Sequence, residues 1–316
     1  MEYRILGKTG LSVSVMGFGA SPLGDVFGVV DAAEATDAVH CAIDNGINYF
    51  DVSPYYGADA LAEERLGQAL AGGWRERALV ATKVGRYKFG GVTTSDYSER
   101  SVFQSVEGSL RRLRTDRIDV YQVHDIQFTT TERLVNETIP AMRKLQAQGK
   151  IRHIGVTSYY PEPMMAVVEQ SDIETVLMFC RCNLVDTSFD DALAPLTKRK
   201  NIGVINASPL HMGLLVDKPR RLVEYGQVHD NTLTRAVARA AALCAQRGTS
   251  LSDLAMRFAF TYPGVATVLS GLSKRRNVER NLAALGKTPD ADTVAVVRKM
   301  LTEAVSPEDP FGFRDD

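Results

Sequence analysis

Short apolar runs alternate along this chain with segments of helical pattern, and this alternation constrains the fold more than any other feature. A short apolar run bounded by turn signals is typical of a buried strand. Strands joined through helices by right-handed crossovers predict a closed α/β architecture, the (β/α)8 TIM barrel. The eight predicted strands are Val15–Gly19, Tyr49–Asp51, Leu79–Lys83, Ile118–His124, Ile154–Thr157, Thr175–Phe179, Gly203–Ala207 and Val265–Gly271.

The segments around these strands are assigned from turn and capping signals. Tyr3–Leu6 and Leu11–Ser14, joined by a Gly-Lys-Thr-Gly turn, are predicted to form an N-terminal β-hairpin. The helices predicted from their caps run from Ser98 to about Leu113, over Glu132–Gln148 after Thr130 or Thr131, and from Ser250 to about Phe260. No repeat, low-complexity tract or linker divides the chain, so residues 1–316 are predicted to form a single domain.

Composition narrows the class of protein. Hydrophobic residues make up 45% of the chain and charged residues 24%, which is typical of a globular enzyme with a large core. A formal net charge of −1 disfavours a nucleic acid or an anionic membrane as partner. No apolar run approaches the roughly 18 residues of a membrane span, and the N-terminus lacks a signal-peptide pattern. Cys41, Cys180, Cys182 and Cys244 have no disulfide-framework or zinc-finger spacing, so we expect reduced cysteines, a cytoplasmic location and no metal.

Four polar residues stand at or just past the ends of predicted strands: Asp51, Tyr56, Lys83 and His124. In a barrel of parallel strands the C-terminal strand ends converge on one face, where such enzymes carry their chemistry. Tyr has a reference pKa near ~10, so it is a poor acid or base at neutral pH unless a cation stabilises its phenolate. Lys83 can supply that charge, Asp51 can hold Lys83 in place, and His124 can orient the reacting oxygen. Together they predict a proton-transfer site.

These four residues, in this order and at these strand ends, resemble the catalytic tetrad of the aldo-keto reductases. Longer phrases, among them Gly17–Gly28, Asp51–Gly57, Lys83–Tyr87 and Ala207–Leu215, resemble the branch of that family whose members oxidise aldoses. The resemblance extends over the whole chain to about Val305. It implies that the hairpin caps the bottom of the barrel. It also implies oxidation of the anomeric C1 hydroxyl of L-galactose, or of an L-fucose-like aldose, to the lactone, with Tyr56 as general base.

The cofactor is also assigned by the resemblance, because no G-x-G-x-x-G fingerprint follows the first predicted strand and a Rossmann fold is therefore not expected. The family places a nicotinamide dinucleotide along the barrel top. For its nicotinamide end the resemblance implies Gly19, Ala20, Asp51, Thr157, Ser158 and Phe179. For the pyrophosphate it implies Ser208, Pro209, Leu210, Gly213 and Leu214. For the adenosine end, at a helix N-terminus, it implies Gly271, Ser273, Lys274, Asn277, Arg280 and Asn281.

Several positions depart from the family pattern. Phe179 stands where the family often has Gln, Ala207 where it often has an aromatic side chain, and Arg280 where Glu is frequent. Gly271 and Asn277 occupy the positions of a Lys and an Arg that flank the 2′-phosphate in NADP-using relatives. We therefore expect NAD to be preferred. The basic run Lys274-Arg275-Arg276 lies in the same segment and leaves NADP as the alternative.

The substrate is expected to be a small sugar enclosed by the connections that follow the strands. These connections are Pro22–Val30, Arg86–Tyr97, Asp125–Thr130 and Leu214–Asp230, the predicted walls and lid of the pocket. The candidate substrate contacts are Phe27, Tyr55, Tyr87, His124, Asp125 and Met212. Asp125 could instead cap a helix, because a carboxylate that follows a strand end is as often a helix cap as a partner of sugar hydroxyls.

Three other functions are weighed against the sugar dehydrogenase. The first is an NADPH-dependent aldehyde or ketone reductase that runs the same site backwards. The second is a non-enzymatic barrel subunit of a channel or complex, which an intact tetrad disfavours. The third is a metal-dependent barrel isomerase, which the five histidines of the chain disfavour, since only His124, His153 and His211 lie near suitable strands. We expect a monomer or weak homodimer.

Overall fold

A computed structural model describes residues 1–216, 230–306, 309 and 311 of the chain. Within this part, eight parallel strands form a closed barrel in the order β10-β11-β12-β3-β4-β5-β8-β9, which confirms the predicted fold. Each barrel strand pairs with the next one along the chain, and the last pairs with the first. The barrel strands are Met16–Gly19 (β3), Tyr49–Asp51 (β4), Leu79–Val84 (β5), Ile118–Val123 (β8), Ile151–Ser158 (β9), Thr175–Phe179 (β10), Gly203–Ala207 (β11) and Thr267–Gly271 (β12).

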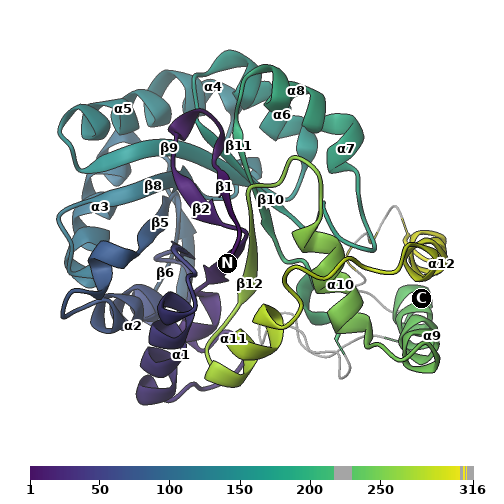
Figure 1. The fold of residues 1–316 in the computed structure, drawn as a ribbon. Coiled ribbons are helices and arrows are strands. Elements are labelled where there is room, and N and C mark those ends of the chain that lie inside the picture. The colour runs from purple at the N-terminus through teal and green to yellow at the C-terminus, as the bar shows by residue number, and fades with distance from the viewer. Residues whose placement is uncertain (217–229, 307–308, 310, 312–316) are drawn as a thin grey trace.

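Helices surround the barrel on its outside (Figure 1). They are Ala32–Asp44 (α1), Leu61–Ala69 (α2), Glu99–Leu113 (α3), Thr131–Arg133 (α4), Ile139–Ala147 (α5), Pro161–Gln170 (α6), Phe189–Ala192 (α7), Ala194–Arg199 (α8), Thr232–Gln246 (α9), Leu251–Phe260 (α10), Arg275–Leu282 (α11) and Ala291–Thr302 (α12). α9 and α12 pack against each other beside the barrel and share a separate apolar cluster with α10. None of the described helices has the length and apolar character needed to cross a bilayer.

The N-terminal hairpin, Tyr3–Ile5 (β1) paired with Ser12–Ser14 (β2), lies across one opening of the barrel (Figure 1). Leu6, Leu11 and Val13 are buried there against side chains of the barrel interior. The turn between the two strands packs on the start of β11, where the backbone N–H of Lys8 donates to the carbonyl of Asn201 at 2.7 Å. The hairpin therefore closes the N-terminal end of the barrel, opposite the predicted site.

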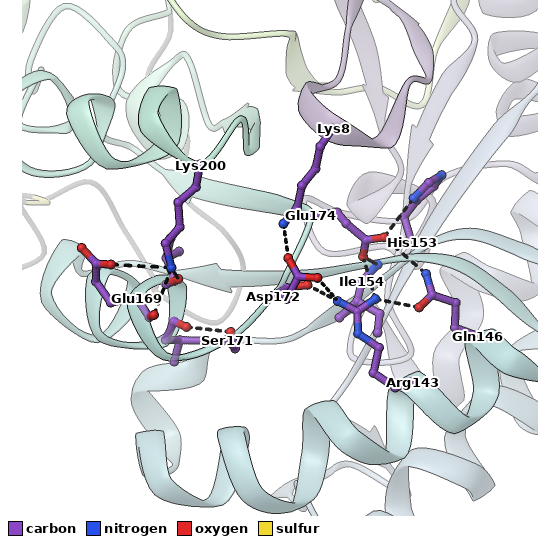
Figure 2. Close-up of polar contacts among 12 residues, drawn as sticks. Lys8, Arg143, Gln146, His153, Ile154, Glu169, Ser171, Asp172, Glu174 and Lys200 are labelled. Atoms are coloured by element: carbon purple, nitrogen blue, oxygen red, sulfur yellow. Dashed lines mark hydrogen bonds and ion pairs between the residues drawn. The ribbon is translucent and has the colours of Figure 1, made fainter.

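A polar network fastens the hairpin to the barrel, as Figure 2 shows. Lys8 forms an ion pair with Asp172, in the connection between α6 and β10. Arg143 of α5 bonds the Asp172 carbonyl and also pairs with Glu174 at 3.4 Å. Glu174 in turn accepts a 2.7 Å hydrogen bond from the Ile154 N–H and contacts His153 at 3.3 Å. Burial raises the pKa of Glu174, but these hydrogen bonds and the Arg143 charge outweigh it and lower the pKa below its ordinary value.

The alternation of side chains along each strand decides which residues reach the barrel interior. Tyr49 of β4 and Ala81 of β5 belong to the buried interior cluster. Asp51 lies two residues after Tyr49, and Lys83 lies two residues after Ala81, so both point the same way as their apolar neighbours. They come at the C-terminal ends of their strands. The strand pattern therefore carries these two charged side chains to the inner rim of the barrel.

Several predicted boundaries were wrong. β12 begins at Thr267 rather than Val265, and β9 begins at Ile151 rather than Ile154 because its first residues pair with β8. The helix predicted over Glu132–Gln148 forms, with Thr130 as its N-cap, but it contains a π-helical segment at Leu134–Thr138. Pro140 follows that segment and has no N–H to donate, which favours the local change in hydrogen bonding.

One element was missed within the predicted connection Arg86–Tyr97. Arg86–Phe89 (β6) and Val92–Ser95 (β7) form an antiparallel hairpin beside the barrel mouth. Its two-residue turn consists of Gly90 and Gly91, both with positive φ, as the favoured hairpin turns require. The predicted lid Leu214–Asp230 falls largely on residues 217–229, which lie outside the described residues.

Candidate active site

A cavity of about 170 Å³ opens at the C-terminal ends of the barrel strands. By the volume that one buried water requires, it has room for roughly a dozen waters. All four predicted catalytic residues line it, Asp51, Tyr56, Lys83 and His124. So do Phe27, Tyr55, Asp125 and Met212 from the predicted substrate set. The structure thus places all the predicted catalytic residues and most of the predicted substrate contacts around one cavity.

Asp51 and Lys83 form a buried ion pair at the base of this cavity. The Lys83 Nζ donates to Asp51 Oδ1 at 2.5 Å and to the Val52 carbonyl at 2.9 Å. The second oxygen of Asp51 accepts a 2.8 Å hydrogen bond from Gln122 Nε2. Burial lowers the pKa of Lys83, but the Asp51 carboxylate and the hydrogen bonds to Asp51 and Tyr56 outweigh it and raise the pKa above its ordinary value. Lys83 is therefore a fixed cation.

Tyr56 lies directly beside that cation. Lys83 Nζ is 4.9 Å from the centre of the Tyr56 ring, and the ring of His124 meets it edge-on at 5.7 Å. Burial raises the pKa of Tyr56 to about 12; the Lys83 charge opposes this rise, and the Asp51 and Asp125 carboxylates add to it. The sequence predicts that Lys83 stabilises the phenolate. The structure adds that burial and the two carboxylates outweigh this effect, so Tyr56 carries its proton at neutral pH.

Two glycines hold the loop that carries Tyr56. A Cβ on Gly57 would lie 2.4 Å from the Gly24 carbonyl oxygen, and a Cβ on Gly24 would lie 2.4 Å from the Tyr56 carbonyl oxygen. Gly57 also has a φ of 83°, which other residues rarely adopt. The 3-10 turn Ser21–Gly24 and the Tyr56 loop can therefore pack backbone to backbone only because both positions are glycine.

His124 is held from several sides. Its Nδ1 lies 3.1 Å from the Ser53 hydroxyl, its backbone N–H donates to Val84, and its carbonyl accepts a 2.9 Å hydrogen bond from Tyr97. Burial lowers the pKa of His124 well below its ordinary value, and the positive charges of Lys83 and Arg86 lower it further. The imidazole is therefore neutral, and its Nε2 side remains for a ligand in the cavity.

Asp125 adds a second buried carboxylate next to His124. Its Oδ2 pairs with Arg86 and lies 3.8 Å from His124 Nε2. The Asp125 backbone N–H donates to the Thr157 hydroxyl at 2.9 Å. Although Asp125 precedes a short 3-10 helix, its side chain makes no capping hydrogen bond, so the helix-cap alternative is wrong. Asp125 lines the cavity instead.

The predicted nicotinamide contacts lie along the same cavity, together with one predicted pyrophosphate contact, Ser208, and one predicted adenosine contact, Gly271. Gly19, Ala20, Asp51, Thr157, Ser158, Phe179, Ser208 and Gly271 all line it. At the end of β12, a Cβ on Gly271 would lie 3.2 Å from Pro22 and 3.9 Å from Phe27, so the missing side chain lets that loop pack closely on the strand end. Phe179 and the small Ala207 supply an apolar wall for a flat ring. A nicotinamide group fits these residues.

The hydroxyls of Thr157 and Ser158 already have partners. Thr157 Oγ1 accepts from the Asp125 N–H and lies 3.4 Å from the Asp125 carboxylate. Ser158 Oγ lies 3.0 Å from Gln127 Oε1 and accepts from the Tyr160 N–H. A carboxamide bound here would share or replace these hydrogen bonds. Gln127 thereby joins the site; it lies in the connection Asp125–Thr130 that the sequence predicts as a pocket wall, but it was not singled out as a contact.

Nine predicted cofactor residues do not line this cavity: Pro209, Leu210, Gly213, Leu214, Ser273, Lys274, Asn277, Arg280 and Asn281. Leu210, Arg280 and Asn281 instead line a separate cavity of about 40 Å³ with residues of α10 and α11. The Asn281 amide donates to Ser270 at 2.8 Å and so ties α11 to β12. Leu214 is buried in the cluster of α9, α10 and α12.

Tyr87 is the predicted substrate residue that the structure places elsewhere. Its hydroxyl lies 2.7 Å from Ser101 Oγ and accepts from the Gly85 N–H, so the ring packs behind the cavity wall. The next residue, Lys88, lines the cavity instead.

Among the residues that sequence reasoning missed, Gln122 had a usable signal, because it precedes His124 by two residues on one strand and shares its face.

In the described part of the chain, His, Cys, Asp and Glu side chains do not gather in a group of three or more that could hold a metal ion. The four cysteines are buried and unpaired with one another.

Comparisons with known proteins agree with this geometry. The model of the aldo/keto reductase family matches residues 15–301. Over 310 residues the chain is 38% identical to an L-galactose dehydrogenase of Arabidopsis thaliana, covering 95% of this chain and 94% of that protein. It is 28% identical over 295 residues to a D-threo-aldose 1-dehydrogenase of a Pseudomonas species, covering 86% and 89%. A solved aldo-keto reductase of Bacillus halodurans in its holo form matches with a TM-score of 0.82 and 29% identity, covering 98% and 99%.

Proposed function

Because this chain belongs to the aldo/keto reductase family of oxidoreductases, we propose that it oxidises the anomeric C1 hydroxyl of an aldose, with L-galactose or an L-fucose-like sugar as substrate, to the lactone. The similarity to two aldose dehydrogenases supports this choice within the family. The family uses NAD(P)H, and the residues at the barrel mouth fit a nicotinamide group.

The Arg86–Asp125 pair is the observation that carries the proposal. Asp125 is 6% exposed, and its carboxylate lies 3.8 Å from the His124 nitrogen that faces the reacting oxygen. A hydroxyl on the carbon next to C1 would come within reach of that carboxylate. A buried carboxylate is costly unless it is paired and hydrogen-bonded, and sugar hydroxyls supply such hydrogen bonds whereas a simple aldehyde does not.

The chemistry follows from the geometry of the four central residues. A nicotinamide held against Gly19, Thr157, Ser158 and Phe179 would supply the hydride acceptor for C1, and the positive charge of its oxidised ring would favour the phenolate of Tyr56. Tyr56 takes the proton of the C1 hydroxyl while the adjacent Lys83 cation stabilises the phenolate. Asp51 and Gln122 keep Lys83 in position. Neutral His124 orients the reacting oxygen through a hydrogen bond. General acid–base catalysis of this kind contributes typically ~10²–10⁴-fold.

One observation favours reduction of an aldehyde or ketone as the second candidate. Phe27, Tyr55 and Tyr159 place aromatic rings in the cavity lining, which suits a carbonyl compound with an apolar body. The same rings can also stack on the apolar face of a sugar. The test is a panel of aldoses and simple aldehydes, followed by nicotinamide absorbance with NAD and NADP in both directions. Turnover confined to the aldehydes would refute the aldose proposal.

An Asp125→Asn variant should separate the two candidates. The asparagine keeps the shape but loses the charge, so kcat/KM for L-galactose should fall by roughly 10- to 150-fold, as expected for one hydrogen bond to a charged group at 1.5–3 kcal/mol. Reduction of a simple aldehyde should change only a few-fold. The Arg86→Met, Asp125→Asn double variant tests whether an unpaired Arg86 causes the loss. Equal losses for both substrate classes would contradict the assigned role of Asp125.

Preference for NAD over NADP is the finer part of the proposal. Two of the three cations in the basic run at the start of α11, Lys274 and Arg275, are engaged by acidic residues of α1. Lys274 Nζ lies 2.9 Å from Glu34 Oε2, and Arg275 makes a two-point contact with Asp37 at 2.5 and 2.8 Å. Using either cation for a 2′-phosphate requires breaking its present pair. This engagement supports NAD as the preferred cofactor.

A Glu34→Gln, Asp37→Asn double variant should therefore use NADP better than the wild type does. Each pair is partly exposed and worth about 0.2–1 kcal/mol, so kcat/KM with NADP should rise by roughly 2- to 30-fold. The kcat/KM of the double variant with NAD should stay within twofold of the wild-type value. Glu99→Gln, which removes the acidic partner of Lys144 elsewhere, is the matched control. A wild type that prefers NADP, or a double variant with no gain, would refute this account.

A cytoplasmic location and a monomeric or weakly dimeric state remain proposals. Buried cysteines that are not paired with one another are in keeping with a reducing compartment.

A further inference from the structure

Ser53 lies between Asp51 and Tyr56 and is completely buried. Its backbone carbonyl accepts a 3.1 Å hydrogen bond from the Tyr56 N–H, and its hydroxyl accepts one of 3.1 Å from the Tyr55 N–H. The same hydroxyl lies 3.1 Å from His124 Nδ1. Tyr55 and Tyr56 of this loop touch the imidazole with their rings, whereas Ser53 forms a hydrogen bond with it. Its backbone is fixed independently, since Lys83 bonds the preceding carbonyl of Val52.

Counting hydrogens at this hydroxyl decides which nitrogen of His124 carries the proton. Within the described residues, Tyr55 N and His124 Nδ1 are the hydrogen-bond partners of Ser53 Oγ. Tyr55 N–H can only donate. If Nδ1 also carried a proton, the Ser53 hydrogen would be buried without an acceptor, at a cost of about 1–3 kcal/mol. If Nδ1 is bare, the Ser53 hydroxyl donates to it and every group is satisfied.

The opposite side of the ring favours the same arrangement. Asp125 Oδ2 lies 3.8 Å from His124 Nε2. A proton on Nε2 would face this negative carboxylate, whereas a lone pair on Nε2 would be repelled by it. Ser53 and Asp125 act on different nitrogens of the ring from opposite directions, so they are independent indications of one tautomer.

We infer that Ser53 is a positioning residue that holds His124 in the tautomer with its proton on Nε2, so that the imidazole presents a hydrogen-bond donor to the reacting oxygen. A donor stabilises negative charge that develops on that oxygen during hydride transfer, which a bare nitrogen cannot do. The inference rests on the proposed oxidoreductase function for its catalytic meaning. Its structural content, the proton on Nε2, does not depend on which substrate the enzyme uses.

Nitrogen NMR of the 15N-histidine-labelled protein without substrate tests this directly. The chain has five histidines, and a His124→Asn sample identifies the His124 signals by their loss. We expect the wild type to show a neutral ring with a bare Nδ1 and a protonated Nε2. Ser53→Ala should raise the population with a proton on Nδ1, and kcat should fall by roughly two- to tenfold, the net effect of one hydrogen bond. Ser53→Thr, which retains the hydroxyl, should restore the wild-type spectrum.

Ser14→Ala is the matched control. Ser14 is also fully buried and hydrogen-bonded, but it lies in the hairpin at the opposite end of the barrel. This variant should leave the His124 signals and kcat unchanged. A wild-type ring with its proton on Nδ1 would overturn the inference, and so would a Ser53→Ala spectrum identical to that of the wild type. If no aldose is turned over but the spectra behave as expected, the proposed substrate fails while the role of Ser53 stands.

Discussion

Replacing Tyr56 by phenylalanine is expected to lower kcat by roughly 10²–10⁴-fold in both directions, the usual contribution of a positioned acid or base. The Tyr56 hydroxyl is the only group removed, and the ring that contacts His124 and Lys83 remains. Dinucleotide affinity should stay within a few-fold of the wild type, because the predicted nicotinamide contacts lie on or beside β3, β4, β9 and β10 and do not include Tyr56. Steady-state kinetics and fluorescence titration with the dinucleotide measure the two quantities separately.

Tyr3→Phe is the control for this experiment. Tyr3 also loses a hydroxyl that makes a hydrogen bond, to the Gly46 carbonyl at 2.9 Å, but it lies on the hairpin at the far end of the barrel. Its kcat should match that of the wild type. If the kcat of Tyr56→Phe lies within threefold of the wild-type value, Tyr56 is not the proton carrier. Another residue of the cavity would then have to carry the proton.

The barrel was predictable because its determinants are local. Each apolar run marks a strand, and the side-chain alternation that buries Tyr49 and Ala81 also carries Asp51 and Lys83 inward. The turn Gly90-Gly91 was an equally local signal for the β6–β7 hairpin and was overlooked. Pro140, which has no N–H to donate, was likewise a local signal for the π-helical segment before it and was overlooked.

The connections within the site were less predictable, because they join residues far apart in the chain. Ser53 and His124 are 71 positions apart, and nothing in either local sequence indicates their hydrogen bond. Arg275 and Asp37 are 238 positions apart, so the basic run suggested a phosphate contact and gave no sign of its acidic partner. Tyr87 was assigned to the pocket by its position near a strand end, but its ring direction depends on the Ser101 hydroxyl of α3.

Replacing Lys83 by methionine is expected to abolish both activity and much of the stability. The side chain is 1% exposed and forms a 2.5 Å ion pair with Asp51, which is also buried. Removing one partner leaves an unpaired buried charge, which costs about 3–5 kcal/mol in free energy of unfolding. Turnover should fall at least ~10²-fold, because Tyr56 loses the cation that stabilises its phenolate. Urea unfolding and kcat measure the two effects, with Lys144→Met, in an exposed pair with Glu99, expected to cost less than about 1 kcal/mol.

The Asp51→Asn, Lys83→Met double variant separates the structural role of this pair from its chemical role. Removing both charges eliminates the unpaired carboxylate, so the double variant should recover a large part of the stability that Lys83→Met loses, as replacement of buried ion pairs by neutral groups often does. Activity should not recover, because no cation then lies beside Tyr56. Recovery of both would mean that Lys83 acts only by neutralising Asp51. Recovery of stability alone would show that the buried charge is retained for proton transfer, at a cost to the stability of the barrel.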